Sequence, residues 1–251
     1  IPLRYLDTPA VGNFPGEQGQ VRYGEGLLVG YRWYDARQLP VAFPFGHGLT
    51  YTTFDYSALS VEVADAAAAR VDVGLTVTNT GPRPGTETVQ LYVADPVATV
   101  MRPTQELKAF GRVDLAPGES RRMRFALDSR AFAWWSPRDG RWVVEGGRFE
   151  LRVGASSRDI RLRAEIELPG DAAAPALTAK SPLGEWLAHP AGGPLLRQLF
   201  DASGSAGLLG NPELMTLMSG NPLDRLCRFP GVGVTDDALA ALVERAQAAA
   251  T

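Results

Sequence analysis

The sequence is poor in the residues that most often bind metals or form covalent cross-links. Among its 251 residues there is one cysteine, Cys227, and there are two histidines, His47 and His189. One cysteine cannot form an internal disulfide bond, and a structural zinc site needs about four cysteine or histidine ligands at short spacings. We therefore expect no metal and no other cofactor, and we expect the Cys227 thiol to be buried and inert.

Long hydrophobic runs are also missing. No stretch approaches the ~18 consecutive apolar residues that cross a bilayer, and no basic start followed by an apolar stretch marks a signal peptide. We expect no contact with a membrane. The chain begins with Ile1 and not with methionine, in proline-rich sequence, so we expect it to be a fragment of a longer protein. Its localisation stays unknown, with export open and the cytoplasm favoured.

The sequence has no excess of positive charge. Lysine and arginine total 25 against 28 aspartates and glutamates, a net charge of −3. Nucleic acid is therefore not an expected partner, because proteins that bind it are usually basic. With 45% hydrophobic residues the chain has the composition of a folded protein of one or two domains. Its 27 glycines and 19 prolines predict many turns between short elements.

The middle of the chain alternates apolar and polar residues in steps of two, which is typical of strands with one buried face. The clearest run is Val71, Val73, Leu75 and Val77, and four similar runs lie within 89–93, 123–127, 149–153 and 160–166. About seven or more short strands with glycine and proline turns between them predict an antiparallel β-sandwich of two sheets. Because the cysteine pair of immunoglobulin domains is missing, we expect a fibronectin type III-like sandwich.

Glycine, proline and aromatic residues dominate the stretch before the sandwich. Leu27, Leu28, Tyr31 and Tyr34 recur at helical spacing and predict one helix from about Glu25 to Asp35, with one buried face. One helix and several turns cannot bury themselves, so this stretch must pack against something larger.

The stretch after the sandwich predicts short helices. Ala172–Ala176 is typical of a linker, and four capping signals follow it: Ser181-Pro182, Asn211-Pro212, Asn221-Pro222 and Thr235. We expect four helices, with His189 near the carbonyl end of one of them. Helices this short need tertiary packing, so they form a small cluster or dock on a neighbouring domain.

Two adjacent groups of residues resemble glycoside hydrolase family 3 β-glucosidases. Four stretches resemble the end of the second catalytic domain of that family: Asn13-Phe14-Pro15-Gly16, Val21–Leu27, Val29–Asp35 and Phe43–Phe54. The fibronectin type III-like domain that follows in the family is resembled by Val77–Gly81, Gly85–Val93, Arg102-Pro103, Glu106–Phe110 and Leu115–Glu119. The helical tail is similar to an extension of some bacterial members.

The resemblance implies a mainly β fold: a fibronectin type III-like antiparallel β-sandwich, preceded by a remnant of an α/β sandwich domain and followed by a short all-α tail. The expected divisions are 1–54 for the remnant, 55–168 for the β-sandwich, 169–180 for a linker and 181–251 for the helical tail. The family's nucleophile and acid/base residues should both lie upstream of Ile1. The resemblance therefore implies a retaining glycosidase whose chemistry lies outside this chain.

No catalytic residue is predicted within the chain. A retaining glycosidase needs two carboxyl groups about 5–5.5 Å apart. Glu17 and Glu25 are the only acids in the glycine-rich stretch from Asn13 to Gly30, and nothing in their spacing holds them face to face. We expect Glu17 to be a solvated turn residue and Glu25 to favour the start of the predicted helix.

Two groups of residues remain as candidates for binding sugar. Glu25, Arg32 and Trp33 combine charge and an aromatic face and could line the rim of a substrate cleft, although packing of their helix is the simpler role. Trp135 and Trp142, which lie with Trp134 in a hairpin-like stretch, could form a carbohydrate platform. Consecutive strand residues point to opposite faces, so one of Trp134 and Trp135 should face the core.

These observations predict a non-catalytic C-terminal part of a β-glucosidase-like enzyme that braces the catalytic domains and shapes the cleft rim. The expected partners are the missing catalytic domains of the same enzyme, or a separate chain that supplies them, and a β-glucoside substrate in the intact enzyme only. Self-association is left open. The alternatives are a stand-alone carbohydrate-binding or adhesion module and one chain of a split glycosidase.

Overall fold

The computed structural model describes residues 1–171 and 176–249, and it divides into two compact units on either side of the boundary between Asp171 and Ala172. Each unit has its own hydrophobic core. Residues 172–175 of the predicted linker lie outside the described residues. None of the described helices is both long and apolar enough to cross a membrane.

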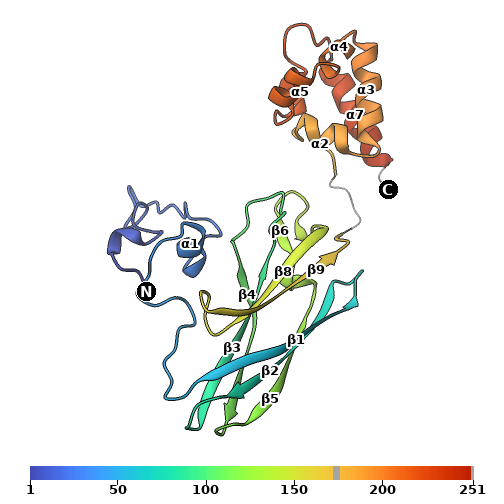
Figure 1. Ribbon diagram of the computed structural model, residues 1–251. Helices are drawn as coiled ribbons and strands as arrows, with labels where there is room; N and C mark the ends of the chain where they lie inside the picture. Colours follow the sequence, from blue (N-terminus) through green and yellow to red (C-terminus); the bar gives the residue numbers. More distant parts are fainter. Residues whose placement is uncertain (172–175, 250–251) are drawn as a thin grey trace. The chain divides into compact units, whose positions relative to one another are not determined.

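The first unit is built on an antiparallel β-sandwich, as the sequence predicts (Figure 1). One sheet has three strands in the order β1-β2-β5: β1 (Phe54–Asp65), β2 (Arg70–Asn79) and β5 (Ser120–Leu127). The other has four strands in the order β4-β3-β8-β9: β4 (Glu106–Leu115), β3 (Gly85–Ala94), β8 (Gly147–Gly154) and β9 (Ile160–Leu168).

The core of the sandwich follows the period-two pattern of the sequence. Val71, Val73, Leu75 and Val77 are all at most 1% exposed, and they pack with apolar residues of β3 and β8 from the other sheet. Burial of this apolar surface is the main stabilising contribution, roughly 25 cal/mol for each Å² removed from water. The prediction of a fibronectin type III-like sandwich is confirmed.

A small hairpin stands apart from the two large sheets. It consists of β6 (Trp134–Ser136) and β7 (Arg141–Val143), which follow the 3₁₀ turn η2 (Ser129–Ala131). Its turn is closed by a hydrogen bond from the Gly140 N–H to the Ser136 carbonyl, and Gly140 has a φ of +61°, a conformation that glycine adopts without strain.

The segment before the sandwich, residues 1–53, has little regular structure. It contains the 3₁₀ turn η1 (Tyr5–Asp7) and the helix α1 (Tyr31–Ala36). The predicted helix from Glu25 to Asp35 is therefore wrong over its first half. Gly26 and Gly30 adopt φ values of +55° and +60°, which interrupt a right-handed helix, and Gly30 becomes the residue that precedes α1.

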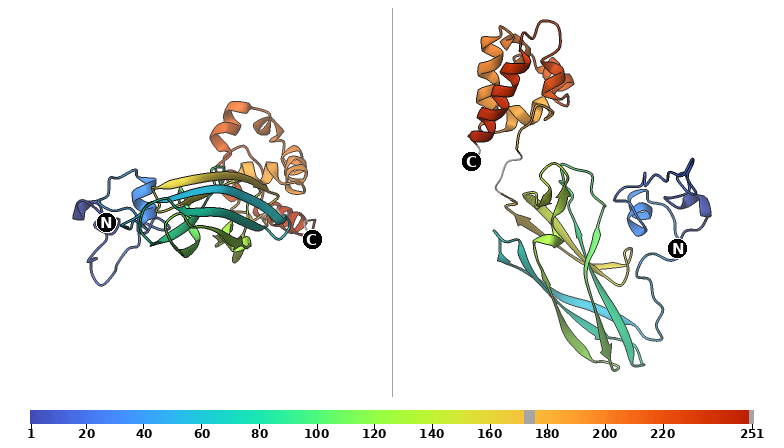
Figure 2. Two further views of the ribbon diagram at one scale, coloured as in Figure 1. Left: turned by 60° about the horizontal axis from the view of Figure 1, so that its bottom comes forward. Right: turned by 180° about the vertical axis from the view of Figure 1, so that it is seen from behind.

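The second unit is helical. Six helices are present in its described residues: α2 (Leu183–Ala188), α3 (Gly192–Ala202), α4 (Ala206–Leu209), α5 (Pro212–Met218), α6 (Leu223–Leu226) and α7 (Asp236–Ala248). In Figure 2 the two longest, α3 and α7, lie side by side. Their apolar faces meet a core that includes Trp186 and Leu196, both 0% exposed.

The prediction of four helices is thus wrong in number, although each of the four signals does precede a helix. Asn211 and Thr235 cap α5 and α7 with their side chains, as expected. Before α2 and α6 the residue at the cap position is proline, and the side chains of Ser181 and Asn221 do not cap. The sequence signals miss α3 because the residue before it, Ala191, has no polar side chain, and they miss α4 because Ser205, which precedes that helix, does not cap it with its side chain.

Two parts of the helical unit are related by a local pseudo-twofold pairing. Pro182 and Pro222 form an isolated antiparallel bridge. The Leu183 N–H donates to the Asn221 carbonyl (2.9 Å), and the Leu223 N–H donates to the Ser181 carbonyl (3.1 Å). Leu183 corresponds to Leu223, and Ser181 corresponds to Asn221 at the same separation along the sequence. The joint is therefore self-complementary in the way that a twofold dimer interface is.

The same spacing relates a second pair of bonds. The Gly184 N–H donates to the Ser219 carbonyl (2.9 Å), and the Asp224 N–H donates to the Ala179 carbonyl (2.8 Å). Leu183 and Leu223 are both buried at this joint. The first turns of α2 and α6 are therefore structural counterparts.

Candidate functional site

An extensive set of aromatic, polar and charged contacts lies where the N-terminal segment meets the four-stranded sheet. Tyr31, the first residue of α1, stacks on Phe45 with ring centroids 4.6 Å apart and meets the edge of Tyr92 at 6.1 Å. Its hydroxyl accepts a hydrogen bond from the Leu107 N–H on β4 (2.8 Å). Figure 1 shows α1 beside the sandwich, near the loop between β8 and β9.

Two buried glutamines extend this contact. Gln90, on β3, donates from Nε2 to the carbonyls of Gly46 (3.1 Å) and Ala155 (2.7 Å), and it accepts from the Tyr92 hydroxyl (2.6 Å). Burial raises the pKa of Tyr92, so its hydroxyl remains a donor. One amide thus ties the N-terminal segment to both strand β3 and the β8–β9 loop.

Gln105 makes the matching contact just before β4. It is 4% exposed and donates from Nε2 to the Ser157 carbonyl (2.6 Å). Ser157 in turn donates its N–H to the Phe45 carbonyl (2.9 Å). Buried amides that satisfy backbone groups in this way fix one arrangement, because breaking a bond leaves a buried polar group without a partner.

Ion pairs complete the contact. Arg158 donates from Nε to Asp35 Oδ1 (2.9 Å) and from Nη2 to the Leu39 carbonyl (2.9 Å), so one side chain holds both ends of the turn after α1. Arg32 of α1 lies 3.1 Å from Glu106 of β4. The segment is therefore anchored by charge as well as by packing.

Glu106 is the centre of a larger charge cluster. It is also 3.5 Å from Arg102 and 3.3 Å from Lys108, and Arg102 pairs with Asp95 at 3.0 Å. Burial lowers the pKa of Lys108, and Glu106 opposes that shift. The Arg102 and Asp95 side chains are almost fully buried, so this cluster fixes α1 against a rigid part of the sandwich.

The N-terminal segment leaves many large apolar side chains exposed. Tyr23, Leu49 and Tyr51 are 81%, 91% and 88% exposed. Ten further large apolar side chains of this segment are also exposed: Ile1, Leu3, Tyr5, Leu6, Phe14, Val21, Leu27, Val29, Phe43 and Phe45. So many exposed apolar side chains in one segment of about fifty residues are unusual for a free surface.

The structure places the three candidate rim residues in different surroundings. Arg32 is paired with Glu106, as described above. Trp33 donates its indole N–H to the Asp7 carbonyl (3.0 Å), with Arg37 4.9 Å from its ring centre. Glu25 lies in a turn before α1 and not at the start of a helix, and its Oε2 is buried without a hydrogen-bond partner among the described residues.

Leu27, which the predicted helix would bury, is 52% exposed. Of the four residues that predicted a buried helical face, Tyr34 alone falls in the buried class, at 9% exposure. The helical spacing at Leu27 and Leu28 was misleading because the chain turns at Gly30 before the helix begins.

The two platform tryptophans lie opposite each other in the small hairpin. Trp135 and Trp142 are partners in the β6–β7 register, and their rings are 5.6 Å apart and inclined by 63°. Both are exposed, whereas Trp134 is half-buried. The Arg130 guanidinium lies 3.5 Å above the centre of the Trp142 ring.

Acidic residues with a raised pKa lie in ion pairs of the sandwich. Burial raises the pKa of Glu87 and that of Asp95, and each lies beside an arginine: Arg161 at 4.0 Å and Arg102 at 3.0 Å. Glu17 is exposed in a turn, where its backbone pairs with that of Gln20. Over the described ranges 1–171 and 176–249, no group of three or more histidine, cysteine or acidic residues could hold a metal.

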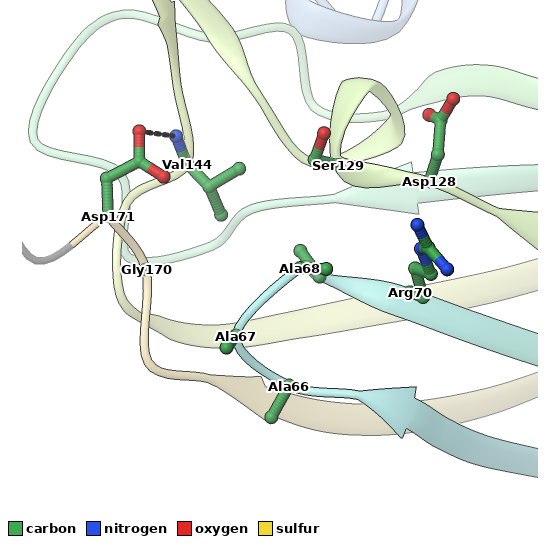
Figure 3. Close-up of a pocket in the computed structure, with 10 residues that line it drawn as sticks. Ala66, Ala67, Ala68, Arg70, Asp128, Ser129, Val144, Gly170 and Asp171 are labelled. Atoms are coloured by element: carbon green, nitrogen blue, oxygen red, sulfur yellow. Dashed lines mark hydrogen bonds between the residues drawn. The ribbon is translucent and has the colours of Figure 1, made fainter.

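A cavity of about 360 Å³ lies at the end of the sandwich, where the β1–β2 turn meets the residues after β9 (Figure 3). It is lined by Ala66–Arg70 and contains two carboxylates. Asp171 accepts from Arg141 (2.8 Å) and from the Val144 N–H (3.3 Å), and Asp128 accepts from the Arg130 N–H (3.0 Å). Both acids have structural partners, and small alanines provide little for a ligand to contact.

The imidazoles and the thiol have structural surroundings too. His47 is exposed, with its ring centre 5.3 Å from that of Phe43. His189 lies at the carbonyl end of α2, as expected, and its backbone N–H donates to the Glu185 carbonyl (3.0 Å). Its imidazole instead bonds the next helix: Nδ1 accepts from the N–H groups of Ala191 (3.2 Å) and Gly192 (3.0 Å), at the start of α3. Cys227 is buried, and burial raises the pKa of its thiol to about 11.

Comparison with known proteins defines the class of the first unit. Residues 87–157 match the family described as a fibronectin type III-like domain. The chain is 43% identical over 237 residues to an exo-α-(1→6)-L-arabinopyranosidase of Bifidobacterium breve, a match that covers 93% of this chain and 31% of that protein. It is 45% identical over 169 residues to the thermostable β-glucosidase B of Acetivibrio thermocellus, covering 67% of this chain and 22% of that protein.

The fold comparison agrees. A crystal structure of a family 3 β-glucosidase from Bifidobacterium adolescentis superposes with a TM-score of 0.72 at 45% identity, covering 78% of this chain and 29% of that one. The chain corresponds to the C-terminal portion of family 3 glycoside hydrolases. It spans about a third of the length of the curated relatives that it matches most extensively.

The residues that join the N-terminal segment to the sandwich were not predicted from the sequence. Gln90 and Gln105 could have indicated this contact, because each is an uncharged polar residue at a buried position in or beside a strand. A buried glutamine must find partners, but the sequence alone does not say where they lie.

Proposed function

We propose that this chain is the non-catalytic part of a β-glucosidase-like retaining glycoside hydrolase, in which the sandwich braces the catalytic part. The observation that carries the proposal is that residues 1–53 are attached to the sandwich and yet leave many large apolar side chains exposed. The attachment is made by Tyr31, Gln90, Gln105 and Arg158. The same segment exposes thirteen large apolar side chains.

The physical argument rests on what must cover those side chains. Each Å² of apolar surface that leaves water contributes about 25 cal/mol, so a segment with thirteen exposed large apolar residues gains strongly from a partner. The curated relatives are about three times as long as this chain, and we propose that the corresponding remainder of the enzyme supplies such a partner. The sandwich then holds the covered segment in place through the buried amides and ion pairs.

The proposal also assigns the bond-breaking carboxylates to a part of the enzyme that precedes the matched region. Retaining hydrolysis needs one carboxylate to attack the anomeric carbon and a second carboxyl group to protonate the leaving oxygen. The buried acids of this chain that have raised pKa values are instead paired with arginines. The β-glucoside is therefore a substrate of the intact enzyme only.

Among the three rim residues, Glu25 has the strongest support for a contact with the catalytic part or its substrate. Arg32 and Trp33 already have partners within the first unit. The Oε2 of Glu25 has no hydrogen-bond partner among the described residues, and a turn of this side chain toward solvent would let it accept a bond from the catalytic part. We assign Arg32 and Trp33 a positioning role and Glu25 the rim contact.

A chimera tests the proposal. In the Acetivibrio β-glucosidase B, the matched 169-residue portion is replaced by the corresponding part of this chain. We expect the chimera to hydrolyse an aryl β-glucoside, and the same enzyme with the portion deleted to be inactive. In the chimera, Arg158→Ala should lower the thermal stability of the activity, whereas the exposed Arg148→Ala should not.

Two alternatives predict different results. A stand-alone module would leave the deleted enzyme active, since nothing would depend on the brace. A split glycosidase would retain the brace but would also show this chain bound to a separate larger protein in the source cell. A deleted enzyme with full activity and unchanged stability would overturn the bracing role.

A further inference from the structure

The β6–β7 hairpin carries an aromatic surface that the bracing role does not use. We call Trp135, Trp142 and Arg130 the hairpin patch. Trp135 and Trp142 are 47% and 41% exposed and lie directly opposite each other on the two strands. Their rings are inclined by 63°, so together they form a shallow corner rather than a flat stack.

Strand alternation accounts for the lower exposure of Trp134 but not for the presence of tryptophan at the exposed positions 135 and 142. This face of the hairpin is not part of the sandwich core. Polar residues at these positions would therefore be sufficient for the hairpin to fold. Tryptophan is the side chain with most to gain from burial, so an exposed cross-strand pair indicates a ligand or a partner.

Arg130 supplies the second observation. Its guanidinium is 3.5 Å from the centre of the Trp142 ring, and it makes no side-chain hydrogen bond or ion pair with any of the residues that the structure describes. A guanidinium has five N–H donors. They are held in place by the ring below and are free to bind the oxygen atoms of a ligand beside Trp135.

The size of the hairpin patch identifies the kind of ligand. A tryptophan side chain offers about 150–250 Å², of which less than half is exposed at each position here, so the two rings present roughly 200 Å². A stable protein interface needs about 800 Å² on each partner. The patch is too small for that, and it matches a single sugar ring.

We propose that the hairpin patch binds one pyranose ring of a neutral oligosaccharide. The apolar face of the sugar stacks on Trp135, the inclined Trp142 ring forms the side wall, and Arg130 donates hydrogen bonds to the ring hydroxyls. This site does not depend on the bracing role, since it uses residues on a different element from the N-terminal segment.

The test is a titration of the full 251-residue chain with cellotetraose, followed by tryptophan fluorescence and by calorimetry. We expect millimolar binding that weakens about tenfold in Trp135→Ala and severalfold in Arg130→Ala, and that Trp135→Tyr partly restores. The matched control is Tyr51→Ala, because Tyr51 is an exposed aromatic residue outside the hairpin. This variant should bind cellotetraose as the unmodified chain does.

Three results would overturn the proposal. One is no binding of cellotetraose by the folded chain, and another is equal binding by the Trp135→Ala variant and the unmodified chain. The third is binding of an oligomer of glucuronic acid with no binding of the neutral sugar, which would assign the patch to an acidic ligand. A failure here would leave the chimera experiment unaffected.

Discussion

The hydroxyl of Tyr31 accepts a hydrogen bond from the backbone N–H of Leu107, 2.8 Å away, although 76 residues separate the two in the chain. The bond joins the first residue of α1 to the edge strand β4. An edge strand has N–H groups without a neighbouring strand, and this one is satisfied by a side chain from outside the sandwich.

Tyr31→Phe removes this acceptor and keeps the ring. We expect the free energy of unfolding of the first unit to fall by about 1–2 kcal/mol, because the Leu107 N–H loses its partner. Denaturant unfolding followed by tryptophan fluorescence measures the change. Tyr23→Phe, at an 81% exposed tyrosine, is the control and should shift the free energy by no more than about 0.5 kcal/mol.

Asn79 is a buried side chain of the sandwich that makes several hydrogen bonds. It is 0% exposed, donates to the carbonyls of Arg83 (2.7 Å) and Leu115 (3.0 Å), and accepts from the Thr52 hydroxyl (2.6 Å). Asn79→Ala should lower the unfolding free energy by about 2–3 kcal/mol, because several buried groups lose their partners together.

Thr78→Ala is the control for Asn79, since its hydroxyl bonds to that of Ser120 at the surface. The same denaturation measurement applies to both variants. Equal effects of the two substitutions would show that the Asn79 contacts do not stabilise the sandwich.

The buried thiol makes the stability of the helical unit depend on alkaline pH. Burial raises the pKa of Cys227 to about 11, whereas an unfolded cysteine titrates near 8.5. Between these values the folded unit binds a proton that the unfolded chain has lost, so its stability falls as pH rises, by up to about 1.4 kcal/mol per pH unit.

The Cys227→Ser variant should be less sensitive to this change, because a hydroxyl does not titrate in the range. Chemical denaturation at pH 8 and at pH 10, followed by the helical circular dichroism signal, provides the comparison. A thiol that reacts rapidly with an aromatic disulfide at pH 8 in the folded chain would contradict its burial.

The pseudo-twofold joint of the helical unit predicts that counterpart residues have matched roles. Leu183→Ala and Leu223→Ala each remove a fully buried side chain, and each should cost about 2–5 kcal/mol. Leu217, which is 76% exposed, should change stability by no more than about 0.5 kcal/mol when replaced by alanine. A large loss for one counterpart and none for the other would show that the joint is not symmetric in energy.

The parts of the fold that the sequence predicts well depend on periodic burial. Val71, Val73, Leu75 and Val77 alternate because one face of β2 lies in the core, and that pattern is visible without the structure. The helix at α1 was harder to predict, since helical spacing of apolar residues continues through Leu27 while Gly30 turns the chain. Backbone geometry at one glycine overrode the pattern.

The contact between the N-terminal segment and the sandwich could not be predicted from the sequence, for a different reason. Tyr31, Gln90 and Arg158 are far apart in the chain, and their partners are mostly backbone carbonyl and N–H groups that every sequence contains. The relative position of the two platform residues could be predicted, because the Asp139-Gly140 turn predicts that Trp135 and Trp142 lie on neighbouring strands of one hairpin. The stacking of Arg130 on Trp142 is known only from the structure.

The central claim is that this chain supports a glycosidase without carrying out its chemistry. The most direct measurement is the hydrolysis of an aryl β-glucoside by the purified 251-residue chain alone. We predict no turnover above the uncatalysed rate and no difference between the chain and its Glu25→Gln variant. Turnover by the chain that disappears in Glu25→Gln would contradict the account.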